Sequence, residues 1–160
     1  MKTIYFIRHA KAKKEGSTDF LRELNKRGRA NAEALGEILK EKKIIPDIIY
    51  TSTAVRALAT ATIISESMNF KGKFKTNDAL YEFEGENLLK FVKNIEDDAN
   101  IIFIVGHNYA ITDVCEVLSD SAIGHIPTCG IFGIGFDVEN FSDIEEKSGE
   151  VLFYSYPTKD

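Results

Sequence analysis

Short apolar runs alternate along this chain with longer segments whose apolar residues recur at helical spacing. The first run, at residues 3–7, is β-branched and aromatic, and after a polar loop the segment 25–43 has the pattern of an amphipathic helix. A second run at 47–50 is followed by Thr51-Ser52-Thr53, which are plausible helix caps, and then by a helix whose apolar residues extend to Met68. The first half of the chain therefore predicts two strand–helix units.

Two more units follow. Residues 73–76 and 86–94 form a weaker pair, a short strand and an amphipathic helix. Residues 100–105 form a run that is continuously apolar after Asn100, and the segment after them carries apolar residues at i, i+3, i+4 and i+7 over 111–118. This last pair is the clearest strand-to-helix unit in the sequence.

The final third adds two more runs, 130–138 and 151–156, on either side of an acidic loop. Strands that are apolar throughout and alternate with helices predict an α/β fold, a three-layer α/β/α sandwich with a mostly parallel sheet. The last two runs are compatible with an antiparallel hairpin at the end of that sheet. Because no linker-like tract or repeat interrupts the chain, we expect residues 1–160 to form a single domain.

Charge and cysteine content narrow the function. The 25 acidic residues outnumber the 20 basic ones, and the net charge of −5 disfavours nonspecific binding to nucleic acid or an anionic membrane. The two cysteines, Cys115 and Cys129, are too few for a disulfide framework, and no cluster of residues has metal-ligand spacing. No signal-like or membrane-spanning run is present. We therefore expect a cytoplasmic protein with buried, reduced thiols and neither metal nor other cofactor.

Candidate chemistry lies where the predicted strands end. In open α/β sheets ligands bind at the carboxyl ends of the strands, and Arg8-His9, Ser52–Arg56 and His107-Asn108 all fall there. One such histidine alone is more often a hydrogen-bonded loop residue, and Arg56 alone is equally well a surface arginine paired with a carboxylate. Two histidines and two arginines at one sheet edge instead favour a cationic pocket for a phosphoryl group.

These residues resemble the signature of a known family. Arg8-His9-Ala10 resembles the Arg-His-Gly motif of the histidine phosphatase superfamily, although Ala10 replaces its glycine. Ser52 with Arg56-Ala57 and Thr60 resembles the superfamily's Ser…Arg-Ala-x-x-Thr segment, and Gly106-His107 resembles its second motif. The resemblance implies a phosphoglycerate mutase-like fold.

Within the superfamily the chain looks like the small SixA-type phosphohistidine phosphatases. That similarity rests on its short length and on a run of residues after the first motif, namely Lys11, Asp19, Arg22, Leu24, Asn25, Arg27 and Gly28.

The resemblance also implies roles. Neutral His9 would attack phosphorus and form a phosphohistidine intermediate, while Arg8, Arg56 and His107 hold the phosphoryl oxygens. Ser52 would add a hydroxyl donor to the substrate. No metal is required.

Three further positions complete the predicted site. Arg22 lies in a loop that borders the entrance, where it would read the substrate. The neighbouring lysines Lys11, Lys13 and Lys14 would make the entrance basic. Asn108 is better suited to capping the following helix.

Glu82 has two interpretations. Larger members of the superfamily carry an acidic proton donor in mid-chain, which Leu80-Tyr81-Glu82 could supply. The SixA-type members are thought to lack it, and Glu82 is then a solvated carboxylate beside Glu84 and Glu86. We favour the second interpretation.

Three functions remain open. The first is a phosphatase acting on protein phosphohistidine, whose partner is a phosphohistidine-bearing protein. The second is a phosphomonoesterase of the same superfamily acting on a small phosphorylated molecule. The third, a noncatalytic phosphate-binding adaptor, has no need of a histidine beside two arginines. Neither the physiological substrate nor the oligomeric state follows from the sequence.

Overall fold

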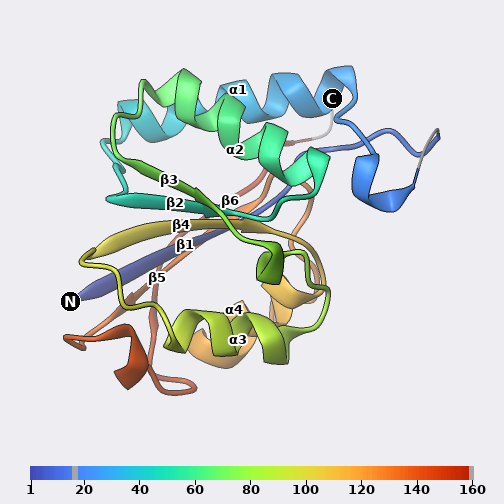
Figure 1. Cartoon of the computed structure of the whole chain (residues 1–160). Coiled ribbons are helices and arrows are strands. Elements are labelled where there is room, and N and C mark those ends of the chain that lie inside the picture. Colours follow the sequence, from blue (N-terminus) through green and yellow to red (C-terminus); the bar gives the residue numbers. More distant parts are fainter. Residues whose placement is uncertain (16–17, 159–160) are drawn as a thin grey trace.

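A six-stranded sheet runs through the middle of the protein and helices cover both of its faces (Figure 1). The computed structural model describes residues 1–15 and 18–158. The strands are β1 (Lys2–Arg8), β2 (Ile48–Thr51), β3 (Lys73–Thr76), β4 (Ile101–Gly106), β5 (Ile131–Phe136) and β6 (Glu150–Ser155). The helices are α1 (Lys26–Glu41), α2 (Val55–Met68), α3 (Gly85–Lys93) and α4 (Ala110–Ser119), with three single 3-10 turns, η1 (Asp19–Leu21), η2 (Asp78–Leu80) and η3 (Phe141–Asp143).

The strands lie in the order β3-β2-β4-β1-β5-β6. The β3/β2, β2/β4 and β4/β1 pairs are parallel, whereas β5 runs antiparallel to both β1 and β6. The mostly parallel sheet and the closing antiparallel hairpin are therefore both confirmed.

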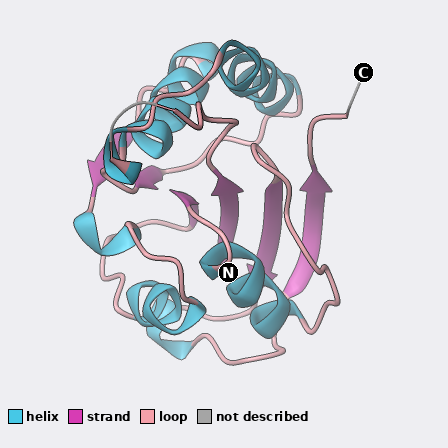
Figure 2. Cartoon of the chain, turned by 90° about the vertical axis from the view of Figure 1, so that its right-hand side faces the viewer, coloured by secondary structure: helices cyan, strands magenta, loops and turns pink. Residues whose placement is uncertain are grey.

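The helices form two layers, with α1 and α2 on one face and α3 and α4 on the other (Figures 1 and 2). Strand β1 is buried on both faces, because Tyr5 and Ile7 point into the core beneath α1 and α2, while Ile4 and Phe6 point into the core beneath α3 and α4. This two-sided burial explains why the strand reads as a continuous apolar run rather than an alternating one. The predicted three-layer α/β/α sandwich is confirmed.

The start of α2 differs from the prediction. The residue that caps this helix is Ala54, which offers no side-chain cap, so the interpretation of Thr51-Ser52-Thr53 as caps is wrong. Thr53 Oγ1 donates instead to Asp78 Oδ1 at 2.7 Å. Ser52 is fully buried and its Oγ accepts from the Ala54 amide at 3.2 Å, ahead of the helix. The Ser52 hydroxyl also contacts His107, and it is therefore not available to cap the helix.

The sheet brings the candidate residues to one edge. In the β2-β4-β1 order, Thr51 pairs with Val105 and Arg8 pairs with Gly106, so these three strands end side by side. The residues that follow them therefore converge at the carboxyl end of the parallel part of the sheet.

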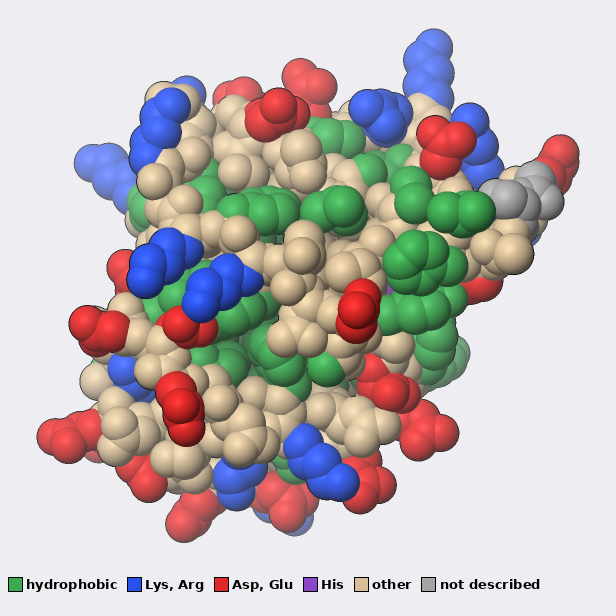
Figure 3. Space-filling model, viewed as in Figure 1, with side chains coloured by type: hydrophobic (Ala, Val, Ile, Leu, Met, Phe, Trp, Pro, Cys, Tyr) green, Lys and Arg blue, Asp and Glu red, His purple; other side chains and the backbone are tan. Residues whose placement is uncertain are grey.

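No helix in the described part of the chain is long and apolar enough to cross a membrane. Acidic and basic side chains are interspersed on the face shown in Figure 3.

Candidate active site

A cavity of about 350 Å³ opens at the carboxyl ends of β1 and β4. His9, Arg56 and His107 form its buried floor, with His9 8% exposed, Arg56 2% and His107 1%. More exposed side chains surround the entrance, among them Lys11, Lys14, Asp19, Arg22 and Phe83. Arg8 lines the cavity as well. Four candidate residues from three separate segments of the chain therefore meet there.

His9 is held as a neutral imidazole with a known tautomer. Its Nδ1 lies 2.8 Å from the Ala10 carbonyl oxygen, which can only accept, so Nδ1 carries the proton. Nε2 is therefore unprotonated, and its electron pair accepts a hydrogen bond from Arg56 Nε at 3.3 Å. Burial is the main cause that lowers the His9 pKa to about 3, with the neighbouring cationic groups contributing. At neutral pH Nε2 carries no proton, as a nitrogen nucleophile requires.

The backbone holds His9 in place from two sides. Its amide donates to the Gly106 carbonyl at 3.0 Å, and its carbonyl accepts from the Cys129 amide at 3.0 Å. Thr60 Oγ1 accepts from the Ala10 amide at 2.9 Å and donates to the Arg56 carbonyl at 2.7 Å. The threonine of the Ser…Arg-Ala-x-x-Thr segment therefore ties the loop after β1 to the first turn of α2.

His107 presents a donor rather than a nucleophile. Its Nε2 lies 2.9 Å from Ser52 Oγ, and this buried hydroxyl, which already accepts from the Ala54 amide, finds its acceptor in that nitrogen. The proton of His107 is then on Nδ1, which is buried and has no hydrogen-bond partner among residues 1–15 and 18–158. Burial, followed by the charge of Arg56, lowers the His107 pKa to about 4.

The two arginines differ in how far their donors are occupied. Arg8 Nη1 lies 2.9 Å from His125 Nε2 and donates to the Ile126 carbonyl at 3.0 Å, while its buried Nε lacks a partner within the described residues. Arg56 is buried, so it is not a surface arginine, and all three of its nitrogens are engaged, two of them by Asp19. Among the described residues the site therefore holds two unpaired buried donors, Arg8 Nε and His107 Nδ1, beside the neutral imidazole of His9.

Comparisons with known proteins agree with this geometry. Residues 4–89 match the family model described as histidine phosphatase superfamily (branch 1). The chain belongs to the histidine phosphatase superfamily. A 43-residue segment, 27% of this superfamily member, is 49% identical to phosphoglycerate mutase 1 of Saccharomyces cerevisiae but spans only 17% of that enzyme.

Solved structures resemble this superfamily member over nearly its whole length. A protein assigned as the phosphohistidine phosphatase SixA of Agrobacterium tumefaciens superimposes with a TM-score of 0.83 at 23% identity, covering 98% of both chains. The corresponding protein of Nakamurella multipartitia gives a TM-score of 0.83 at 21% identity over 99% of this chain and 97% of that one. A mycobacterial glucosyl-3-phosphoglycerate phosphatase gives 0.71 at 14% identity, over 98% and 100%. These likenesses establish the phosphoglycerate mutase-like fold.

Ser52 and Arg22 lie in different places relative to the cavity of this superfamily member. Ser52 does not line the cavity but stands behind His107, so the structure brings it to the site indirectly. Arg22 lines the entrance, where Nε donates to the Lys13 carbonyl at 2.8 Å and Nη1 contacts Asp19 Oδ1 at 3.2 Å.

Glu82 is not brought to the cavity. Its carboxylate accepts from the Phe83 amide at 3.0 Å, the Glu84 amide at 3.1 Å and Asn87 Nδ2 at 3.0 Å. These bonds, led by the Glu84 amide, lower the Glu82 pKa. The carboxylate therefore organises the turn before α3, while its neighbour Phe83 lines the cavity and packs against His107 with ring centroids 5.1 Å apart.

Asn108 caps the following helix as predicted. Its Oδ1 accepts from the Thr112 amide at 3.3 Å and from Thr112 Oγ1 at 2.7 Å, one residue ahead of the formal cap position at Tyr109.

Sequence reasoning assigned no role to Asp19. Its only signal was a place in the SixA-like run of residues, which does not reveal that its carboxylate reaches Arg56. His125, which lies in the loop between α4 and β5, contacts Arg8. The Asp19–Arg56 and Arg8–His125 contacts join residues far apart in the chain, so no local sequence pattern could predict them.

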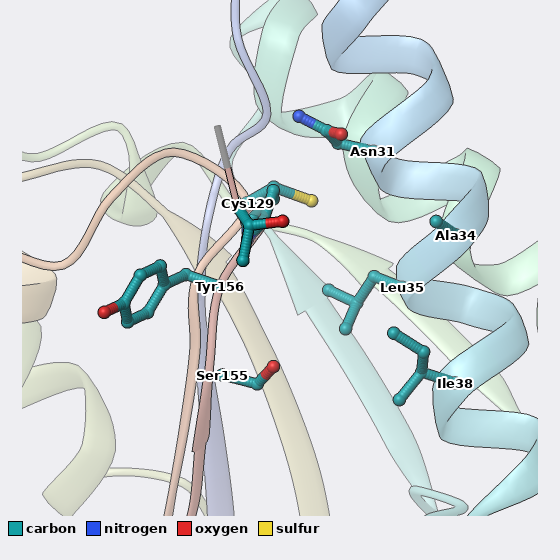
Figure 4. Close-up of a pocket in the computed structure, with 9 residues that line it drawn as sticks. Asn31, Ala34, Leu35, Ile38, Cys129, Ser155 and Tyr156 are labelled. Carbon is teal, nitrogen blue, oxygen red and sulfur yellow. The ribbon is translucent and has the colours of Figure 1, made fainter. Parts of the chain in front are cut away.

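The cysteines are free and buried, as expected. A second cavity, of about 240 Å³, lies between α1 and the segment after β6, and Cys129 lines it with its sulfur pointing toward α1 (Figure 4). Burial raises the Cys129 pKa to about 12, so the thiol is unreactive at neutral pH. The described residues contain no group of three or more His, Cys, Asp or Glu arranged to hold a metal.

Proposed function

We propose that this protein is a phosphatase that works through a phosphohistidine intermediate on His9 and acts on protein phosphohistidine. One observation carries the proposal: His9, which is unprotonated at Nε2, lines the same cavity as Arg8 and His107, whose Nε and Nδ1 atoms are buried without partners in the described chain. Buried donors are costly to leave unpaired. Phosphoryl oxygens would supply the acceptors that both groups lack.

The reaction has two steps. The electron pair of His9 Nε2 forms a bond to phosphorus as the bond from phosphorus to the leaving nitrogen breaks, and that nitrogen takes a proton from solvent. Water then attacks phosphorus, the electron pair of the P–N bond returns to Nε2, and the hydrogens of the water leave with inorganic phosphate or pass to solvent. Arg8, Arg56 and His107 would hold the equatorial oxygens while their charge is redistributed.

The carboxyl groups of the described residues near the cavity are not suited to donate a proton, which supports an N–P substrate. Of the two carboxyl groups near the site, Glu82 lies outside the cavity lining, and hydrogen bonds led by that from Tyr81 hold the Asp19 pKa at about 2. Both are ionised at neutral pH, so neither is poised to protonate an alkoxide leaving group. The imidazole of phosphohistidine can leave as a neutral or readily protonated nitrogen and does not need such a donor.

The entrance supports a protein partner. Lys11 and Lys14 are exposed beside Arg22, which gives the entrance a basic edge although the chain carries a net charge of −5. The global charge speaks against nucleic acid and anionic membranes as partners. Free cysteines accord with the cytoplasmic location that we propose.

A small phosphate ester is the second candidate. The cavity of about 350 Å³ is large enough for a small metabolite, and the fold is shared with a mycobacterial glucosyl-3-phosphoglycerate phosphatase. A noncatalytic adaptor is the least supported function, because it does not require a neutral histidine held beside two arginines.

The decisive experiment traps the intermediate. The protein is mixed with a carrier protein labelled with ³²P on histidine, or with an alkyl phosphate, and quenched rapidly under conditions that preserve phosphohistidine. We expect label on His9, faster turnover of the carrier, full activity in the presence of a chelator, and no turnover by a folded His9→Ala variant. Label on another residue, or turnover by His9→Ala, would overturn the mechanism, and a preference for the alkyl ester would favour the second candidate.

A further inference from the structure

Asp19 makes a two-point contact with Arg56. Arg56 Nη1 donates to the Asp19 main-chain carbonyl at 2.7 Å, and Nη2 donates to Asp19 Oδ2 at 3.1 Å. Arg56 Nε donates to His9 Nε2. A guanidinium group has five N–H donors in one plane, so these three contacts fix its orientation and leave one N–H on each Nη free. These two N–H groups are the Arg56 donors that remain for a phosphoryl group, in addition to Arg8 Nε and His107 Nδ1.

Asp19 is itself held from the other side. Tyr81 Oη donates to Oδ2 at 2.6 Å, and Arg22 Nη1 contacts Oδ1 at 3.2 Å. The Tyr81 ring also packs edge-to-face against Phe20, with centroids 5.1 Å apart. The turn η1 and the segment around Tyr81, which are 62 residues apart in sequence, are therefore joined at this carboxylate.

The same carboxylate puts a negative charge at the site. The Tyr81 hydrogen bond and then Arg56 keep the Asp19 pKa low, so the group stays ionised. It is the single acidic side chain among the described residues that line the cavity. An anionic phosphoryl group bound to Arg56 would lie close to the negative charge of Asp19. Repulsion between the two like charges would oppose binding even with partial solvent screening.

We propose that Asp19 is the positioning residue of Arg56, and that it aligns the guanidinium for phosphoryl transfer at the expense of ground-state affinity for the oxyanion. This inference rests on the proposed function. Asp19 acts through Arg56, because its two contacts hold the plane of the guanidinium in one orientation. Its negative charge also keeps inorganic phosphate from binding too tightly after the reaction. Misalignment of a positioned group by about 1 Å can cost on the order of 10²-fold in rate.

The two effects predict opposite changes in two measurements. In Asp19→Asn, which removes the charge but keeps the size, we expect kcat toward the phosphohistidine carrier to fall about tenfold or more. Inorganic phosphate, measured by calorimetry, should bind at least about threefold more tightly, because the opposing charge is gone. Loss of structure alone would instead weaken phosphate binding together with turnover.

Two further variants separate alignment from charge. Tyr81→Phe removes one hydrogen bond to Asp19 but leaves its charge, so kcat should fall while phosphate affinity does not rise. Asp98→Asn, at an exposed carboxylate away from the cavity, should change neither quantity. Since the Asp19 side chain is 48% exposed, the Asn variant should melt within a few degrees of the wild type.

The outcome is readable whether or not the proposed function holds. If the wild type forms no phosphohistidine on His9, the proposed function fails and the inference fails with it, and the phosphate titration then reports only the effect of the Asp19 charge on anion binding. If the wild type turns over normally but Asp19→Asn binds phosphate equally or more weakly, or keeps its full kcat, the inference fails and the proposed function stands.

Discussion

Ser52 Oγ lies 2.9 Å from His107 Nε2 and assigns the proton of that histidine to Nδ1, the ring nitrogen that has no partner in the described chain. The serine of the Ser…Arg-Ala-x-x-Thr segment thus acts through a histidine 55 residues away. It controls which atom His107 presents to the cavity, although its own hydroxyl does not line that cavity.

Ser52→Ala should therefore impair catalysis by changing the tautomer of His107. Without the hydroxyl, Nε2 can keep the proton, and Nδ1 then meets a phosphoryl oxygen with an electron pair instead of a donor. We expect kcat/KM to fall on the order of 10²-fold, the scale of one lost charge-stabilising donor. Nitrogen-15 NMR of the imidazoles would report the tautomer. Ser142→Ala, at an exposed serine, is the matched control, and an unchanged tautomer with unchanged kcat/KM would refute the assignment.

Arg56→Ala should lower kcat/KM by on the order of 10²-fold or more, because the variant loses a positioned guanidinium at the phosphoryl site. Arg56→Lys should recover little of this loss, since an ammonium group cannot contact His9 and both Asp19 oxygens from one plane. Steady-state kinetics with Arg29→Lys, an exposed substitution on α1, provides the comparison. Near-normal rates in both Arg56 variants would show that the guanidinium does not take part.

Glu82→Gln should change phosphohistidine hydrolysis by less than about threefold, because the carboxylate is bound to the turn before α3 and not to the cavity. Esters with poor leaving groups should be turned over slowly by both proteins, since general acid catalysis is worth about 10²- to 10⁴-fold. The comparison requires an alkyl ester and a phosphohistidine under the same conditions, with Glu86→Gln as the control. A large loss with an alkyl ester that the wild type hydrolyses well would instead identify Glu82 as the donor.

The stability of the protein should fall as the pH drops from about 6.5 toward 5. The pKa values of His9 and His107 are about 3 and about 4 in the folded protein, against an ordinary 6.5, so in this range the unfolded chain binds protons that the folded chain does not. Each histidine can contribute a slope of up to about 1.4 kcal/mol per pH unit to the free energy of unfolding. The Asp19 carboxylate titrates below this window.

Urea unfolding between pH 7.5 and 5 in phosphate-free buffer would measure that slope. A His9→Asn/His107→Asn double variant should show a flatter dependence, with no difference in slope above pH 7. Equal slopes in the two proteins would mean that these imidazoles are not buried in their neutral form.

Much of the fold could be predicted because its cause is local. The run at residues 100–105 and the helix after it are apparent from periodicity, as β4 and α4 confirm. The start of α2 could not be predicted, because capping propensity describes a free hydroxyl, and those of Ser52 and Thr53 are bound to His107 and Asp78. For both Ser52 and Thr53, a contact with a residue distant in the chain replaced the local capping preference.

The sequence by itself determined the sandwich and the convergence of Arg8-His9, Arg56 and His107, because parallel strands that alternate with helices place their carboxyl ends at one sheet edge. Only the tertiary structure decided what each group does there. The neutral Nε2 of His9, the unpaired Nδ1 of His107 and the Asp19 contact to Arg56 depend on burial and on angles between segments up to 55 residues apart. Protonation and hydrogen-bond direction follow from the local dielectric and the nearest partner atom, and neither is written in the order of residues along a chain.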